Sequence, residues 1–141
     1  MKEPLIYIID NDLVSAFEIG IRLHQSKMRC NVTAFSDIKS ALEMLETSFN
    51  HEEGLPDIML VSFDMPGMDR DCFLDKFKNN PLISNNTDLY VFSSFGISNA
   101  PGKFDSISRI KRSFTKPLSK KDIQKIFQDF QNRIQKSQIS A

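Results

Sequence analysis

An unbroken apolar run in the middle of the chain constrains the fold more than any other feature. Residues 58–61 read IMLV and are followed by Ser62. A strand with one solvated face alternates apolar and polar side chains, whereas a strand covered on both faces is apolar throughout. Met65-Pro66-Gly67 then predicts a sharp turn, because proline fixes φ and glycine allows positive φ. This stretch therefore predicts a central strand with helices packed on both sides.

Other segments predict strands and helices that alternate along the chain. Further strands are expected at residues 5–9, 30–35, 89–92 and 110–114, and the last is short and polar, as suits a sheet edge. Apolar residues at helical spacing predict helices at 13–24, 38–49, 69–78 and 119–134, with a weaker segment at 99–108. This alternation predicts an α/β fold: a doubly wound, five-stranded parallel sheet with helices on both faces.

Some local details are also predicted. Leu13, Phe17, Ile21 and His24 repeat at helical spacing and define the first helix, which Asp12 can cap. Ser36 or Asp37 can cap the second helix, whose apolar face includes Phe49. Asn79-Asn80-Pro81 ends the third helix, and 51–56 is a loop.

Length and composition predict a single ordinary domain. The chain has 141 residues, of which 40% are hydrophobic and 26% charged. We expect one domain over residues 1–136 and a frayed tail over 137–141. No apolar run is long enough to span a bilayer, and the first residues lack a signal-peptide pattern, so a cytoplasmic location is expected. Cys30 and Cys72 lack metal or redox spacing and are expected to be reduced thiols.

Charge is unevenly distributed although it sums to zero. Residues 1–100 hold 8 Lys/Arg and 15 Asp/Glu, a difference of −7, and residues 101–141 hold 10 and 3, a difference of +7. A basic segment can indicate a nucleic-acid partner. Here the basic residues are interleaved with apolar core positions, and the chain has no DNA-binding motif. Neither nucleic acid nor membrane is an expected partner.

Polar side chains follow the predicted strands at one end of each. Asp10 follows the first strand, Ser62 ends the third, Ser93 follows the fourth and Lys116 follows the fifth. The carboxyl ends of parallel strands meet at one edge of the sheet, where α/β proteins bind ligands. These residues are therefore the candidate site.

The same segments resemble the receiver domain of bacterial two-component response regulators over residues 5 to 135. The resemblance rests on Asp10-Asn11-Asp12 after an apolar strand, on PDIMLV followed by MPGMD, on Ser93-Ser94 after a strand, and on Lys116-Pro117. It implies a flavodoxin-like fold with strand order 2-1-3-4-5 and a cis Lys116–Pro117 peptide bond.

The resemblance also exposes departures from the family pattern. The family accepts a phosphoryl group on an aspartate at the position of Ser62, and a serine hydroxyl needs a neighbouring base to act as a nucleophile. The second member of the family's metal-binding acid pair falls at Asn11. The family usually has an aromatic residue at the position of Ser113, whose ring moves inward on activation, and a serine cannot make that packing change.

Other members of the site are retained or replaced. Ser93 and Lys116 match the family's hydroxyl and lysine that contact the phosphoryl group. Without a phosphate, Lys116 is expected to pair with Asp10 or Asp64. Asp10 and Asp64 could form a weak Mg²⁺ site at most, because Mg²⁺ prefers several charged oxygen ligands. No cofactor is otherwise expected.

The favoured hypothesis is a degenerate, stand-alone receiver domain, not an enzyme, that acts in two-component or phosphorelay signalling through phosphorylation-independent protein interaction. One alternative is a working phosphoswitch that uses Asp64, Asp10 or Ser62. Another is a ligand-binding or enzymatic flavodoxin-like protein, although none of the 5 glycines forms a phosphate-binding loop.

The expected partner is a signalling protein, either a histidine kinase or a downstream effector, or a second copy of the chain. The resemblance implies contact through the strand Ile110–Phe114 and the helix Ser119–Ile134. Basic residues on that side favour an acidic partner surface.

Overall fold

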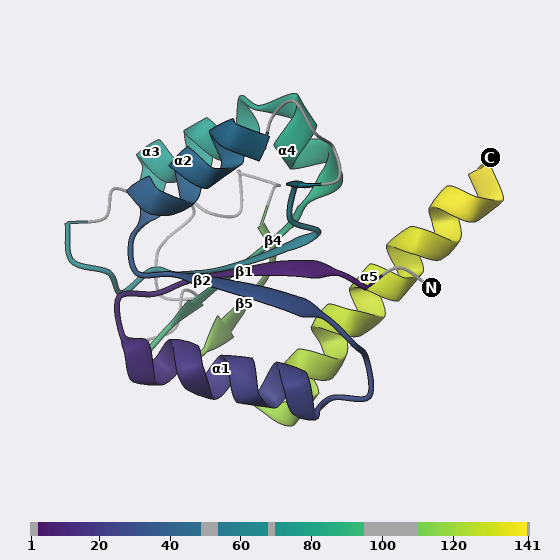
Figure 1. Cartoon of the computed structure of the whole chain (residues 1–141), viewed down its shortest axis with the longest axis horizontal. Coiled ribbons are helices and arrows are strands. Elements are labelled where there is room, and N and C mark those ends of the chain that lie inside the picture. The colour runs from purple at the N-terminus through teal and green to yellow at the C-terminus, as the bar shows by residue number, and fades with distance from the viewer. Residues whose placement is uncertain (1–2, 49–53, 68–69, 95–109, 141) are drawn as a thin grey trace.

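The chain folds into a five-stranded parallel sheet with helices on both faces (Figure 1). The computed structural model describes residues 3–48, 54–67, 70–94 and 110–140. The strands are β1 (Leu5–Ile9), β2 (Asn31–Phe35), β3 (Ile58–Ser62), β4 (Asp88–Ser93) and β5 (Ile110–Thr115). The helices are α1 (Leu13–Gln25), α2 (Ile38–Ser48), α3 (Arg70–Lys78), α4 (Pro81–Asn86) and α5 (Lys120–Ser140). The strand order β2-β1-β3-β4-β5 confirms the predicted fold.

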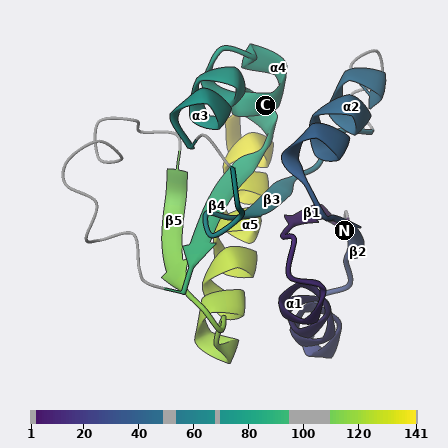
Figure 2. The ribbon, with the colours of Figure 1, turned by 90° about the vertical axis from the view of Figure 1, so that its left-hand side faces the viewer.

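The central strand β3 has the double-sided burial that its sequence predicted. All five of its residues are buried. Met59 and Val61 face the apolar cluster beneath α2 and α3, and Ile58 and Leu60 face the cluster beneath α1 and α5. Full burial of each such side chain contributes about 1.5–3 kcal/mol. Both layers of helices therefore depend on this strand, and Figure 2 shows it inside the sheet, between β1 and β4.

The first helix is placed as predicted, but its buried face differs from the repeat that predicted it. Asp12 caps α1 by accepting hydrogen bonds from the backbone N–H groups of Val14 and Ser15. The buried residues are Ala16, Ile19 and Leu23, whereas Leu13 and Phe17 are 73% and 70% exposed. The helix carries two apolar stripes, and spacing alone does not decide which of them meets the sheet.

The connection between α3 and β4 contains a short helix that the sequence analysis missed. Asn80 accepts a hydrogen bond from the Ile83 N–H and caps α4, and Pro81 occupies its first turn. A proline that ends one helix is equally suited to begin the next, because its first-turn N–H has no helical partner to lose. The buried Ile83 fixes this turn against the core.

Several other local predictions can be compared with the described residues. Asp37, not Ser36, accepts the Ser40 N–H at 2.7 Å at the start of α2. Gly67 has a φ of 70°, as the predicted turn requires. The helix α5 continues to Ser140, beyond its predicted end at Ile134. The expected fraying of the tail from Ser137 stays a prediction. The helix predicted at 99–108 and the side chain of Phe49 lie outside the described residues.

None of the helices in the described ranges is both long and apolar enough to cross a bilayer.

A buried polar cluster joins α5 to the sheet. Asp129 accepts two hydrogen bonds from the Arg112 guanidinium, at 2.8 and 3.0 Å, and one from the Tyr90 hydroxyl at 2.9 Å. The Arg112 hydrogen bonds lower the pKa of Asp129, whereas burial and the adjacent carboxylate raise the pKa of Tyr90. One carboxylate therefore links β4, β5 and α5.

The Tyr90–Asp129 hydrogen bond leads to a prediction. The change Tyr90→Phe removes only the hydroxyl and should lower the free energy of unfolding by about 1–2 kcal/mol, because a buried hydrogen bond to a charged group is lost. Urea denaturation measures it. In the Asp129→Ala background the same change should cost less, since the acceptor is already gone. An equal cost in both backgrounds would show that the hydroxyl stabilises the fold through some other contact.

Candidate functional site

The parallel strands bring the predicted site residues to one edge of the sheet. Asp10 directly follows β1, Ser62 and Ser93 end β3 and β4, and Lys116 directly follows β5. Asp10, Ser62 and Ser93 are each no more than 2% exposed. The Lys116–Pro117 peptide bond is cis, as the resemblance implied. Asn11 is exposed on the adjoining turn.

The ammonium group of Lys116 lies beside two carboxylates. Its Nζ is 2.9 Å from Asp10 Oδ2 and 3.8 Å from Asp64 Oδ2, and it sits 5.2 Å from the centre of the Phe92 ring. Asp10 Oδ1 accepts the Asp12 N–H at 3.0 Å. Asp10 Oδ2 is buried without an aligned hydrogen bond, so the close ammonium provides its main compensation. Both of the ion pairs considered from the sequence are therefore present.

The carboxylate of Asp64 contacts the residues at the end of β4. Its Oδ1 accepts the Ser93 hydroxyl at 2.8 Å and its Oδ2 accepts the Ser94 N–H at 2.8 Å. Partial burial alone would raise the pKa of Asp64, but the hydrogen bonds from Ser94 and Ser93 and the charge of Lys116 together hold it below its usual value. The carboxylate is thus an anion already held by a hydroxyl, an amide and an ammonium group.

Ser62 lies beneath this cluster and contacts it through Asp64. Its hydroxyl oxygen accepts the Asp64 N–H at 3.2 Å, and its side chain is fully buried. His24 is near the far end of α1, roughly 16 Å along the helix from Leu13. His51 lies outside the described residues. The described surroundings of Ser62 therefore lack the histidine that would activate its hydroxyl.

The charged groups of the site do not fit a magnesium centre well. Within the described ranges, no three His, Cys, Asp or Glu side chains come together as a metal-binding group. Asp10 and Asp64 both face the Lys116 ammonium, which repels a second cation. That Asp10 and Asp64 form a weak Mg²⁺ site at most stays a prediction.

Two groups at this edge were missed by sequence reasoning. The backbone N–H of Ser94 binds Asp64, and no side-chain pattern signals a backbone donor. Arg70, at the start of α3, donates to the Phe63 carbonyl at 2.8 Å and lies 5.1 Å from the centre of the Phe63 ring. In the sequence, the only sign that Arg70 lies at this edge was its position shortly after the predicted Met65-Pro66-Gly67 turn.

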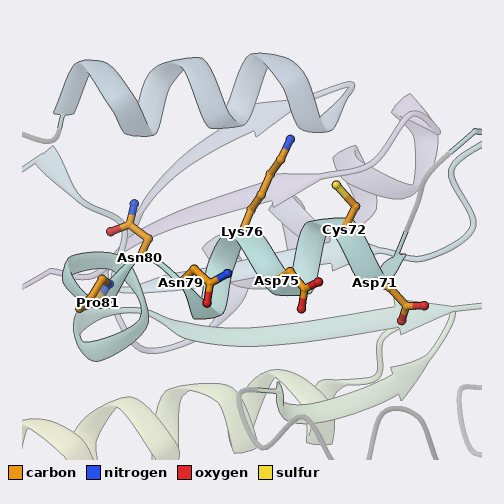
Figure 3. A pocket seen from close by; sticks show the side chains of 7 residues that line it. All are labelled: Asp71, Cys72, Asp75, Lys76, Asn79, Asn80 and Pro81. Atoms are coloured by element: carbon orange, nitrogen blue, oxygen red, sulfur yellow. The ribbon is translucent and has the colours of Figure 1, made fainter.

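A hollow lies on a different part of the surface from the residues around Lys116. It is an open depression on α3 and the start of α4, and Figure 3 shows the side chains that line it. Asp71 and Asp75 lie on the same helix as the exposed Cys72. The hollow includes none of the residues that surround Lys116.

Comparison with known proteins identifies the fold but no close relative. No family model and no curated protein match the sequence. A two-component response regulator from Cytophaga hutchinsonii is similar in structure, with a TM-score of 0.77, 16% identity and coverage of 93% of this chain and 99% of that one. A two-component response regulator from Legionella pneumophila has a TM-score of 0.73 and 19% identity, with coverage of 93% of this chain and 99% of that one. The Mn²⁺-bound form of the response regulator Rcp1 has a TM-score of 0.63 and 17% identity, with coverage of 89% of this chain and 90% of that one.

The chain therefore has the fold of response regulator receiver domains. The match covers nearly the full length of each neighbour, and the strand order is the one that the resemblance implied.

The anion role of Asp64 leads to a prediction with a defined pH dependence. Because folding lowers its pKa, Asp64 contributes stability above the unfolded pKa, near 4, and loses that contribution as pH falls through the lower folded pKa. Asp64→Asn should therefore be less stable than the wild type at pH 7, with the gap narrowing below about pH 4. Urea denaturation across pH measures it.

The control for that experiment is Asp75→Asn, which neutralises an exposed acid on α3. It should leave the free energy of unfolding nearly unchanged. A gap between wild type and Asp64→Asn that stays constant down to low pH would contradict the assignment.

The second site prediction concerns the buried position of Ser62. Ser62→Asp places a further carboxylate near Asp10 and Asp64, and should lower the melting temperature in metal-free buffer because like charges are buried together. The uncharged Ser62→Asn has nearly the same size and is the matched control. If Ser62→Asp melts at or above Ser62→Asn without Mg²⁺, the charge balance described for this site is wrong.

Proposed function

We propose that the chain is an atypical receiver domain that works in two-component or phosphorelay signalling through protein–protein contacts that do not require aspartyl phosphorylation. The receiver-domain fold supports a signalling role. The absence of an aspartate at position 62 and the lack of a histidine beside Ser62 in the described structure argue against phosphoryl transfer.

The contacts of Asp64 carry this proposal. In the family that the sequence resembles, the phosphoryl group binds the hydroxyl and the lysine that match Ser93 and Lys116. Here the Asp64 carboxylate contacts both groups, at 2.8 and 3.8 Å, and takes the Ser94 N–H as well. The groups that would recognise a phosphate are thus engaged by an anion of the chain itself. This arrangement favours a fixed state over a switch.

Exposed apolar residues support an interaction role. Leu13, Val14, Phe17 and Ile21 are exposed on α1, although isolated domains seldom expose several large apolar side chains together. The predicted contact surface on β5 and α5 remains part of the proposal. Its positive charge is smaller than the sequence suggested, because Arg112 is neutralised by Asp129. A histidine kinase, a downstream effector or a second copy of the chain is the proposed partner.

The runner-up is a phosphoswitch with altered chemistry. Of its three candidate acceptors, Asp10 and Ser62 are buried, and Asp64 is the most accessible. Phosphorylation of Asp64 would have to break its contacts with Ser93 and Ser94. An enzymatic role is not part of the proposal.

One titration separates the two readings. Amide NMR spectra are recorded with Mg²⁺ alone, then with acetyl phosphate or beryllofluoride added. We expect no saturable shifts near Ser62, Ser93 or Lys116, because Lys116 and Asp64 already neutralise each other. Saturable shifts at millimolar Mg²⁺ and phosphodonor would favour the phosphoswitch.

The matched variant carries Asn11→Asp and Ser62→Asp, which restore the acids of the family pattern. It should gain Mg²⁺-dependent shifts that the wild type lacks. Mg²⁺ shifts of equal size in both proteins would mean that the wild-type site binds metal after all.

A further inference from the structure

A groove between α1 and α5 carries a charge pattern that the site at the sheet edge does not use. We propose that it binds an acidic segment of a partner protein, with one apolar side chain of that segment seated on the groove floor. The groove encloses about 890 Å³ and lies between the end of α1, the segment before β2 and the first half of α5. Both helices cover the same face of the sheet (Figure 1).

The floor of the groove is apolar and recessed. Ile123 and Phe127 of α5 line it, and they are only 2% and 6% exposed because they also belong to the core. Met28 closes the floor from the segment before β2 and is half-buried. A narrow inserted side chain can reach such a floor, whereas a flat surface cannot. Gln25 and Gln124 on the walls offer amide donors and acceptors to a peptide backbone.

The rim of the groove is strongly basic. Arg22, Lys27, Arg29 and Lys120 line it, and Glu3 is the one acid in the lining, so the described lining carries a net charge of 4 − 1 = +3. None of these four cations forms a salt bridge within the described residues, although Arg112, Lys116 and Arg133 elsewhere do. Their field is therefore available to an external anion.

Shape and charge together favour a peptide over other polyanions. Nucleic acid presents a phosphate charge about every 1.7 Å of duplex and is bound by long arrays of cations, not by four around an apolar floor. An anionic membrane needs apolar side chains that protrude, and those of this groove are recessed. Carboxylates that flank an apolar side chain match the rim and the floor at once. The groove volume also falls within the range of about 300–1,000 Å³ typical of ligand sites.

The test uses the full chain and a set of fluorescein-labelled peptides in which glutamates flank one leucine at different spacings, measured by fluorescence anisotropy. We expect saturable binding by at least one peptide, weakened by salt. The double variant Lys27→Glu/Arg29→Glu should reduce the affinity by about tenfold or more, since two attractive charges become repulsive. The single change Gln124→Glu, on the groove wall, should also weaken binding without touching the core.

The matched control is Lys39→Glu/Lys78→Glu, which makes the same net charge change at exposed positions of α2 and α3 outside the groove. It should bind the peptide like the wild type. Equal losses in the two double variants, or no saturable binding by any peptide, would overturn the proposal. Tighter binding of single-stranded DNA or of phosphatidylserine vesicles than of every peptide would overturn it in favour of those ligands.

Discussion

The buried carboxylate of Asp10 constrains the rest of the site, because it is almost fully removed from water. Such a charge is stable only beside a compensating group, and the Lys116 ammonium at 2.9 Å supplies it. The pair joins the end of β1 to the end of β5 across the carboxyl edge of the sheet. Once Lys116 is held there, it also lies 3.8 Å from Asp64, so one ammonium group serves both carboxylates.

The proposed function requires a receiver fold that persists without phosphorylation chemistry, and this charge balance supports that proposal. In a pocket with several carboxylates, the like charges repel one another and a cation is needed to balance them. Here the Lys116 ammonium lies beside two carboxylates, and the neighbouring Ser62 is neutral. Asp64 also accepts hydrogen bonds from the Ser93 hydroxyl and the Ser94 N–H, so neither donor is left without an acceptor. The stability of the edge and its proposed fixed state thus have the same physical origin.

Two surfaces remain that the site does not require. The outward stripe of α1 is apolar, and the groove beside it is rimmed by cations without acidic partners in the described structure. The stripe lies on α1, whereas the groove lies between α1 and α5 and so shares α5 with the surface that the family resemblance pointed to. An interaction protein with a fixed site would depend on surfaces of this kind for its specificity.

Much of this molecule follows from local pattern. The apolar run 58–61 predicted a doubly buried strand, the alternation of elements predicted the α/β class, and strand ends predicted which residues share an edge. Hydrophobic periodicity is a local property of the sequence, and in a parallel sheet the carboxyl ends of the strands lie at one edge. These inferences therefore succeed without knowledge of long-range contacts.

Tertiary structure alone decided which apolar stripe of α1 is buried, because Ala16, Ile19 and Leu23 compete with an equally apolar set on the opposite side. It also decided the hydrogen-bond donors to the Asp64 carboxylate, which lie 29 and 30 residues away in sequence, one of them a backbone N–H that no side-chain pattern can reveal. The sequence by itself determined the class of fold and the residues at its functional edge. Only packing in three dimensions determined which charges meet there, because electrostatic pairing depends on distances that separation along the chain does not encode.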